Sequence, residues 1–126
     1  MFLDEDLMDK YYNGYCNNIL WPLFHYMGLP QDCKFKKSND FKSQLNSYEK
    51  ANQMFADVVC QMYTEGDTVW CQDYHLMLLP MILKKFNINM KVGWFLHTPF
   101  PSPEVFRALP NPVELLEAVI KADLVG

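Results

Sequence analysis

Two short stretches of this 126-residue chain end in side chains that can hydrogen-bond to a ligand. Residues 70–76 lead from an apolar run into an acid, a phenol and an imidazole in succession at positions 73–75. Residues 92–101 contain a second apolar run, which ends in His97. Each run is typical of a buried strand, and ligands bind at the carboxyl ends of the strands in open parallel sheets. We therefore predict that the two strand ends form one wall of a binding site.

Two roles for Asp73 remain open. Aspartate is a preferred helix N-cap, so Asp73 could serve only to begin the helix expected from about Leu76. Alternatively, its carboxylate lies at the strand edge and accepts hydrogen bonds from ligand hydroxyls, as recognition of a sugar requires. Both roles can hold together.

His97 could cap backbone groups or lie satisfied in the core. Its separation from Asp73 is about one strand-helix-strand repeat, so adjacent parallel strands would bring both residues to one edge. Asp73, His75 and His97 would also make a two-histidine, one-carboxylate metal set, but their spacing matches no strong metal motif. We therefore predict no metal site.

Tyr12 and Trp21 lie in a segment that is rich in aromatic residues and amides. Aromatic residues on a helix are usually core residues. The neighbouring amides of Asn13, Asn17 and Asn18 also suit a carbohydrate pocket, where ring faces pack on C–H surfaces while amides meet hydroxyls. Sequence periodicity does not decide between these alternatives.

The elements that must position these residues form a βαβ unit. Strands are predicted at 68–71 and 91–96, with a helix at 76–86 that tolerates Pro80 in its first turn. The crossover in such a unit is right-handed and makes the two strands parallel. A long helix capped by Ser38 or Asp40 and stopped at Gly66 precedes the first strand.

The remaining elements follow from breakers and helix-start signals. One helix, or two short helical pieces, covers 7–26, is interrupted at Asn13-Gly14 and Pro22, and ends near Gly28. A turn at 28–32 leads into a polar loop that continues to about Asn39. A three-proline loop at 98–103 precedes helices at 103–109 and 112–120 and a strand that begins at about 122. These elements predict an α/β fold.

Composition excludes several classes of protein. Half of the residues are apolar, enough for one domain with a core, and the net charge of −4 argues against a nucleic-acid or anionic-membrane surface. No apolar run is long enough to span a membrane, and the N-terminus lacks the features of a signal peptide. The four cysteines form no C-x-x-C pair, which favours the reducing cytoplasm.

The chain alone contains no complete catalytic machinery. It lacks phosphate-binding glycine motifs, a G-x-S-x-G nucleophile motif and a paired acid motif of glycosidases. Arg107 is its single arginine, whereas a chain that gripped phosphate unaided would show several.

Three motifs are spread along the chain: residues 11–14 (YYNG) with 20–26 (LWPLFHY), residues 70–76 (WCQDYHL), and residues 95–101 (FLHTPFP). Together and in register they closely resemble the UDP-forming alpha,alpha-trehalose-phosphate synthases of glycosyltransferase family 20, especially the plant type. Gln72 stands where that family often has histidine. The resemblance implies part of a Rossmann-like parallel-sheet domain of a GT-B glycosyltransferase. Residues 1–126 would be an incomplete N-terminal, acceptor-side domain, with the C-terminal donor-binding domain absent.

The resemblance also implies function. Such enzymes transfer glucose from UDP-glucose to glucose 6-phosphate with retention of anomeric configuration, and the leaving diphosphate is thought to help deprotonate the acceptor. Tyr12, Trp21 and Asp73 would then belong to the glucose 6-phosphate site, and His97 would contact the donor glucose. No catalytic residue, metal or cofactor is assigned, and the full-length protein could be an oligomer. The alternative is a non-catalytic interaction or regulatory module derived from the same fold.

Overall fold

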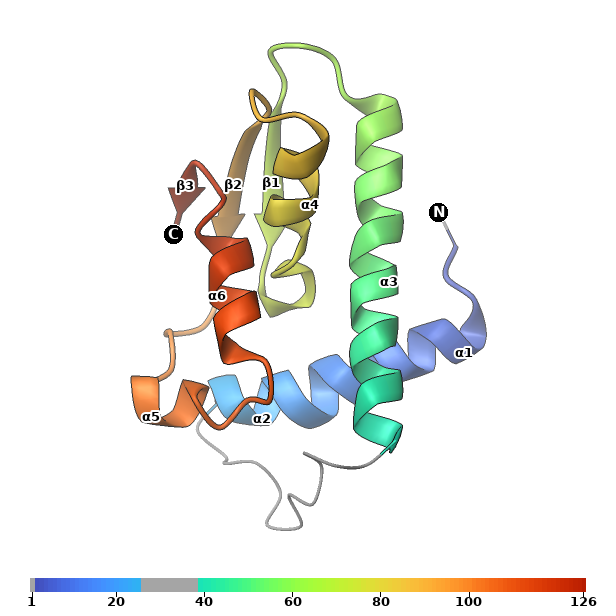
Figure 1. Cartoon of the computed structure of the whole chain (residues 1–126), viewed down its shortest axis with the longest axis vertical. Coiled ribbons are helices and arrows are strands. Elements are labelled where there is room, and N and C mark those ends of the chain that lie inside the picture. The colour runs from blue at the N-terminus through green and yellow to red at the C-terminus, as the bar shows by residue number, and fades with distance from the viewer. Residues whose placement is uncertain (1, 26–38) are drawn as a thin grey trace. The chain divides into compact units, whose positions relative to one another are not determined.

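The computed structural model describes residues 2–25 and 39–126, which fall into two compact units (Figure 1). The helical unit draws on Met1–Ala51 and Thr98–Pro112, and the sheet unit on Asn52–His97 and Val113–Gly126. Helix α3, Asn39–Met62, contributes to both and confirms the long helix predicted before the first strand. The predicted turn at 28–32, the Ser38 cap and Cys33 lie outside the described residues.

The helical unit begins with one continuous helical run. Helix α1, Glu5–Met8, passes into the π-helix η1, Asp9–Leu20, and then into α2, Trp21–Phe24. The N–H of Trp21 donates to the carbonyl of Cys16, five residues back, as π-helical geometry requires. The predicted interruptions at Asn13-Gly14 and Pro22 are therefore wrong.

Both breaker residues have a physical reason to lie inside this run. A Cβ on Gly14 would lie 2.9 Å from Cγ of Gln44 on α3, so glycine permits the two helices to approach closely. Pro22 directly follows the π-helical stretch, where the hydrogen bonds change from a five-residue to a four-residue spacing. The predicted end of the run near Gly28 lies outside the described residues.

Aromatic rings form the core of the helical unit. Tyr15 is fully buried, its ring centroid lies 4.6 Å from that of Tyr48 on α3, and its hydroxyl donates to Oδ1 of Asn111 over 2.7 Å. Phe100, in the predicted three-proline loop, packs between Phe24 and Phe106. The loop is followed by the short helix α5, Pro103–Phe106, which begins where predicted and ends earlier.

The sheet unit contains three parallel strands in the order β1-β2-β3. They are β1, Thr68–Gln72, β2, Lys91–Phe95, and β3, Leu124–Val125. The crossover helix α4, Leu79–Phe86, lies on the near side of the sheet in Figure 1. Helix α6, Pro112–Val119, leads to β3. The predicted βαβ unit and α/β class are confirmed.

One local prediction in this unit is wrong. The helix expected from Leu76 begins at Leu79, and a short 3₁₀ turn, η3, Tyr74–Leu76, precedes it. Pro80 lies in the first turn of α4, as expected. Proline has no N–H and is tolerated in the first turn of a helix but not in its interior, so a helix that contains Pro80 begins close to that residue.

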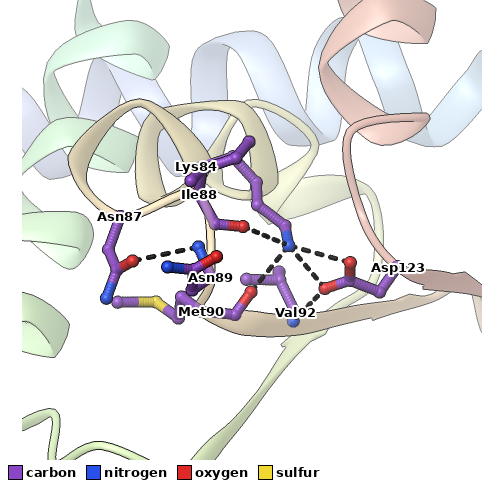
Figure 2. A network of polar contacts seen from close by, with 7 residues as sticks. All are labelled: Lys84, Asn87, Ile88, Asn89, Met90, Val92 and Asp123. Carbon is purple, nitrogen blue, oxygen red and sulfur yellow. Dashed lines mark hydrogen bonds and ion pairs between the residues drawn. The ribbon is translucent and has the colours of Figure 1, made fainter.

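Lys84, whose side chain is largely buried, joins the amino-terminal ends of β2 and β3 through the contacts drawn in Figure 2. Nζ of Lys84 donates to the carbonyl oxygens of Met90 at 2.7 Å and Ile88 at 3.2 Å, and forms an ion pair with Asp123 at 2.7 Å. The Asp123 carboxylate also accepts the N–H of Val92 at 2.8 Å. These contacts join α4, β2 and the start of β3, and so set the register of the third strand.

Candidate functional site

The backbone of Asp73 is held in a strained conformation just beyond β1. Its φ of 65° and ψ of −179° make it the one non-glycine residue with positive φ in the described part of the chain. Its N–H donates to the carbonyl of Phe95 over 2.7 Å, and its own carbonyl accepts from Nε1 of Trp94 over 3.0 Å. Such strain costs about 1–3 kcal/mol and clusters at ligand-binding sites. The neighbouring strand therefore maintains this conformation.

The carboxylate of Asp73 has one oxygen in use and one available. Oδ1 accepts the N–H of Tyr74 over 2.9 Å, so Asp73 does act as a cap, although for the 3₁₀ turn η3 rather than for α4. Oδ2 makes no hydrogen bond with any described residue. The capping role and a ligand-binding role are therefore compatible, as the sequence allowed.

His97 lies at the same edge, two residues beyond β2. Nε2 of its exposed ring lies 2.7 Å from Oε1 of Gln72, the last residue of β1. The adjacent N–H of Leu96 donates to the carbonyl of Gly126 over 2.9 Å, so the end of β3 supports this segment. The structure thus brings Asp73 and His97 together at the carboxyl ends of β1 and β2, as predicted.

His75 contributes differently from the other two candidates. Its ring stacks on that of Tyr74 at 4.3 Å between centroids, and burial lowers its pKa, an effect that the charge of Asp73 partly offsets. Among residues 2–25 and 39–126, no cluster of three histidine, cysteine or acidic side chains could hold a metal ion. The metal alternative built on Asp73, His75 and His97 finds no support in this arrangement.

Tyr12 and Trp21 belong to the helical unit and lie on its surface, with 46% and 44% of each side chain exposed. In a helix with five-residue hydrogen bonding, residues four to five apart lie over one another. One series of buried side chains and one series of outward-facing or half-buried side chains both recur at that interval. The buried series is Tyr11, Tyr15, Ile19 and Phe24. The outward-facing or half-buried series is Met8, Tyr12, Asn17 and Trp21. Tyr12 and Trp21 therefore share one exposed stripe with an amide between them.

The ring of Trp21 is held in place. It stacks on His25 at 3.5 Å between centroids, and Nδ1 of His25 lies 2.9 Å from the carbonyl oxygen of Trp21. Neither Tyr12 nor Trp21 is a core residue, so the structural alternative considered for them is wrong. The reason is the π-helical winding, which a 3.6-residue period does not capture.

Sequence reasoning missed two residues that organise the site. The sequence marks Trp94 only as part of a strand, and the available signal is that a buried indole N–H must find an acceptor. Gln72 stands where the family it resembles often has histidine, and nothing in the sequence indicates its contact with His97. Burial raises the pKa of the neighbouring Cys71 thiol to about 12, so the thiol is protonated near neutral pH.

The described cysteines Cys16, Cys60 and Cys71 are free thiols. No helix in the described part of the chain is long and apolar enough to cross a membrane.

Comparison with known proteins gives one consistent result. The family model for glycosyltransferase family 20 matches residues 1–126. Alpha,alpha-trehalose-phosphate synthase [UDP-forming] 1 of Arabidopsis thaliana is 64% identical over 126 residues, which are 100% of this chain and 13% of that protein.

Two solved structures are similar over nearly the whole chain. One is the E. coli enzyme bound with UDP-2-fluoro glucose, with a TM-score of 0.85, 36% identity, and coverage of 98% of this chain and 26% of that one. The other is an alpha,alpha-trehalose-phosphate synthase of Burkholderia xenovorans in complex with glucose-6-phosphate, with a TM-score of 0.83, 33% identity, and coverage of 97% and 25%. The chain thus spans about a quarter of each solved protein.

Proposed function

Because the chain belongs to glycosyltransferase family 20, we propose that it supplies part of the sugar-binding site of a trehalose-6-phosphate synthase. That enzyme transfers glucose from UDP-glucose to glucose 6-phosphate. The likeness to solved synthases bears out the predicted fold class, part of a parallel-sheet domain of a GT-B glycosyltransferase. Within such an enzyme the segment would form an acceptor-side portion of the N-terminal domain.

The observation that carries this proposal is the arrangement of Asp73 and His97 at one sheet edge. A strained aspartate with one carboxylate oxygen that no described residue contacts, beside an imidazole just beyond the next strand, suits the binding of sugar hydroxyls. Asp73 would orient glucose 6-phosphate, and His97 would contact the donor glucose. Asp73 is thus a positioning group, and no protein nucleophile is needed.

Tyr12 and Trp21 would contribute ring faces to the glucose 6-phosphate site. Their shared exposure supports this role, because a ligand can pack only on rings that the core does not cover. UDP-glucose enters as a substrate, and the proposal requires no cofactor, metal or nucleic acid. The cytoplasm is the proposed compartment, supported by the free thiols of the described cysteines. An oligomer of the full-length protein remains part of the proposal.

A segment exchange tests the proposal directly. The Arabidopsis relative would carry these 126 residues in place of its own matching segment, a replacement at 64% identity. We call this protein the chimeric enzyme. Release of UDP and formation of trehalose 6-phosphate would be measured with both substrates. Activity within about tenfold of the parent, which corresponds to about 1.4 kcal/mol in the barrier, is the expected result.

The same experiment addresses the alternative of a non-catalytic module. A chimeric enzyme that folds, as judged by circular dichroism, yet forms no product would exclude the proposed catalytic role and leave the interaction or regulatory role. The 126-residue chain by itself is expected to form no product, because it corresponds to about a quarter of each solved synthase. Measurable turnover by the 126-residue chain alone would contradict the proposal that it supplies only part of the sugar-binding site.

A further inference from the structure

The contact between Gln72 and His97 joins two side chains across the carboxyl ends of β1 and β2, and no sequence pattern predicted it. Gln72 pairs with Phe95 in the parallel register of β1 and β2, and His97 follows Phe95 by two residues. Alternate residues of an extended chain share a side, so the two side chains can meet. Oε1 of Gln72 and Nε2 of His97 lie 2.7 Å apart.

A second contact restricts the same ring. The ring centroids of Phe95 and His97 lie 4.9 Å apart with an interplanar angle of 65°, an edge-to-face arrangement. The exposed imidazole is therefore held by an amide oxygen at one nitrogen and by an aromatic ring beside it. An exposed side chain without such contacts would change rotamer freely.

The chemistry of the amide oxygen assigns the proton. A glutamine carbonyl oxygen can only accept a hydrogen bond, so Nε2 of His97 must donate. In neutral imidazole only one nitrogen carries a proton, and the other is an acceptor. With the proton on Nε2, Nδ1 of His97 is left as an acceptor.

We propose that Gln72 is a positioning residue that holds His97 as the Nε2–H tautomer and so leaves Nδ1 to accept a hydrogen bond from a ligand hydroxyl. This inference rests on the proposed sugar-binding function for the identity of the ligand. An acceptor nitrogen binds a hydroxyl, whereas it cannot donate to a phosphate oxygen. Gln72 thereby directs His97 to the sugar part of a nucleotide sugar rather than to its phosphates.

The chain provides its own control for the proton assignment. His25 places Nδ1, not Nε2, 2.9 Å from the carbonyl oxygen of Trp21. Because a carbonyl only accepts, neutral His25 must carry its proton on Nδ1. The structure therefore assigns opposite tautomers to His25 and His97 in the same protein.

Nuclear magnetic resonance of the 126-residue chain with ¹⁵N-labelled histidine distinguishes these forms. The chain has three histidines, so His25→Gln and His97→Gln variants suffice for assignment. Long-range ¹H–¹⁵N spectra would be recorded at about pH 9, where an ordinary imidazole is neutral. We expect the Nε2–H pattern for His97 and the Nδ1–H pattern for His25. An Nδ1–H pattern for His97, which would mean that the amide nitrogen of Gln72 donates instead, overturns the proposal.

Two substitutions at position 72 separate the amide's role from general packing. Gln72→Glu keeps an oxygen acceptor and should keep Nε2 as the donor, whereas Gln72→Leu removes the acceptor and should shift the His97 signals toward a mixture of tautomers. An unchanged circular dichroism spectrum would show that each variant is folded. If Gln72→Leu leaves the His97 signals unchanged, Gln72 does not set the tautomer.

The chimeric enzyme supplies the functional readout. Gln72→Leu should lower kcat/KM for UDP-glucose roughly tenfold, the value of one hydrogen bond of about 1.4 kcal/mol, with Gln72→Glu closer to the parent. An unchanged kcat/KM for Gln72→Leu would overturn the positioning role. A chimeric enzyme that is inactive with Gln72 in place would instead refute the proposed function, while the spectra still decide the tautomer.

Discussion

The indole of Trp94 and the backbone of Asp73 are joined by a 3.0 Å hydrogen bond from Nε1 to the carbonyl oxygen. Trp94 is almost fully buried in β2, whereas Asp73 is the residue after β1. The one described non-glycine residue with positive φ is therefore supported by a core side chain from the adjacent strand. Site geometry and core packing are coupled at this point.

This coupling predicts the effect of Trp94→Phe. The variant keeps an aromatic ring in the core but loses the hydrogen bond, and the unfolding free energy should fall by about 1–2 kcal/mol. Urea unfolding provides the measurement. Trp70→Phe is the matched control on the same sheet, where half of the indole is exposed, and it should cost less. Equal losses in the two variants would show that the Asp73 contact contributes nothing.

Substitutions of Asp73 should separate strain from ligand binding. Glycine tolerates φ of 65° and alanine does not, so Asp73→Gly should be more stable than Asp73→Ala by about 1–2 kcal/mol. Both variants lack the carboxylate, and in the chimeric enzyme both should show a large loss of kcat/KM for glucose 6-phosphate. A normal rate in either would reduce Asp73 to a cap.

The exposed stripe predicts that Tyr12 and Trp21 affect binding more than folding. Tyr12→Ala and Trp21→Ala should each raise KM for glucose 6-phosphate in the chimeric enzyme. Met8→Ala is the control, because Met8 is equally exposed on the same stripe, and its KM should not change. Tyr15→Ala removes a fully buried ring and should cost about 3–5 kcal/mol, well above the cost of Tyr12→Ala. A KM unaffected by both aromatic substitutions would contradict the proposed ring contacts.

The Lys84–Asp123 pair predicts a pH dependence of stability. The hydrogen bond from Lys84, followed by that from the N–H of Val92, holds the pKa of Asp123 below its usual value of 3.8. A folded-state pKa that is lowered contributes stability above the unfolded-state pKa, and this contribution is lost as pH falls through the folded value.

Asp123→Asn should therefore be less stable than the parent chain near neutral pH, and the difference should shrink below about pH 4. Denaturant unfolding at several pH values gives the comparison. In a Lys84→Met background the effect of Asp123→Asn should be smaller at every pH, because the main partner is gone. If the difference in unfolding free energy between Asp123→Asn and the parent chain does not change with pH in this range, the ionised Lys84–Asp123 pair is not its source.

The sequence by itself determined the elements that depend on local signals. The apolar runs, Gly66 and the proline-led helix starts predicted α3, the three strands and the start of α5, because burial period and backbone restriction act within a few residues. The βαβ rule then placed Asp73 and His97 at one edge without reference to any side-chain contact.

Only the tertiary structure decided the features that depend on distant partners. The π-helical winding of η1 accompanies the close approach of Gly14 to Gln44, which no local pattern around Gly14 encodes. The strained backbone of Asp73 and the orientation of His97 depend on Trp94 and Gln72, each from the neighbouring strand. Local propensity places a residue at a strand end, but its conformation there is fixed by hydrogen bonds that form only when the strands pair.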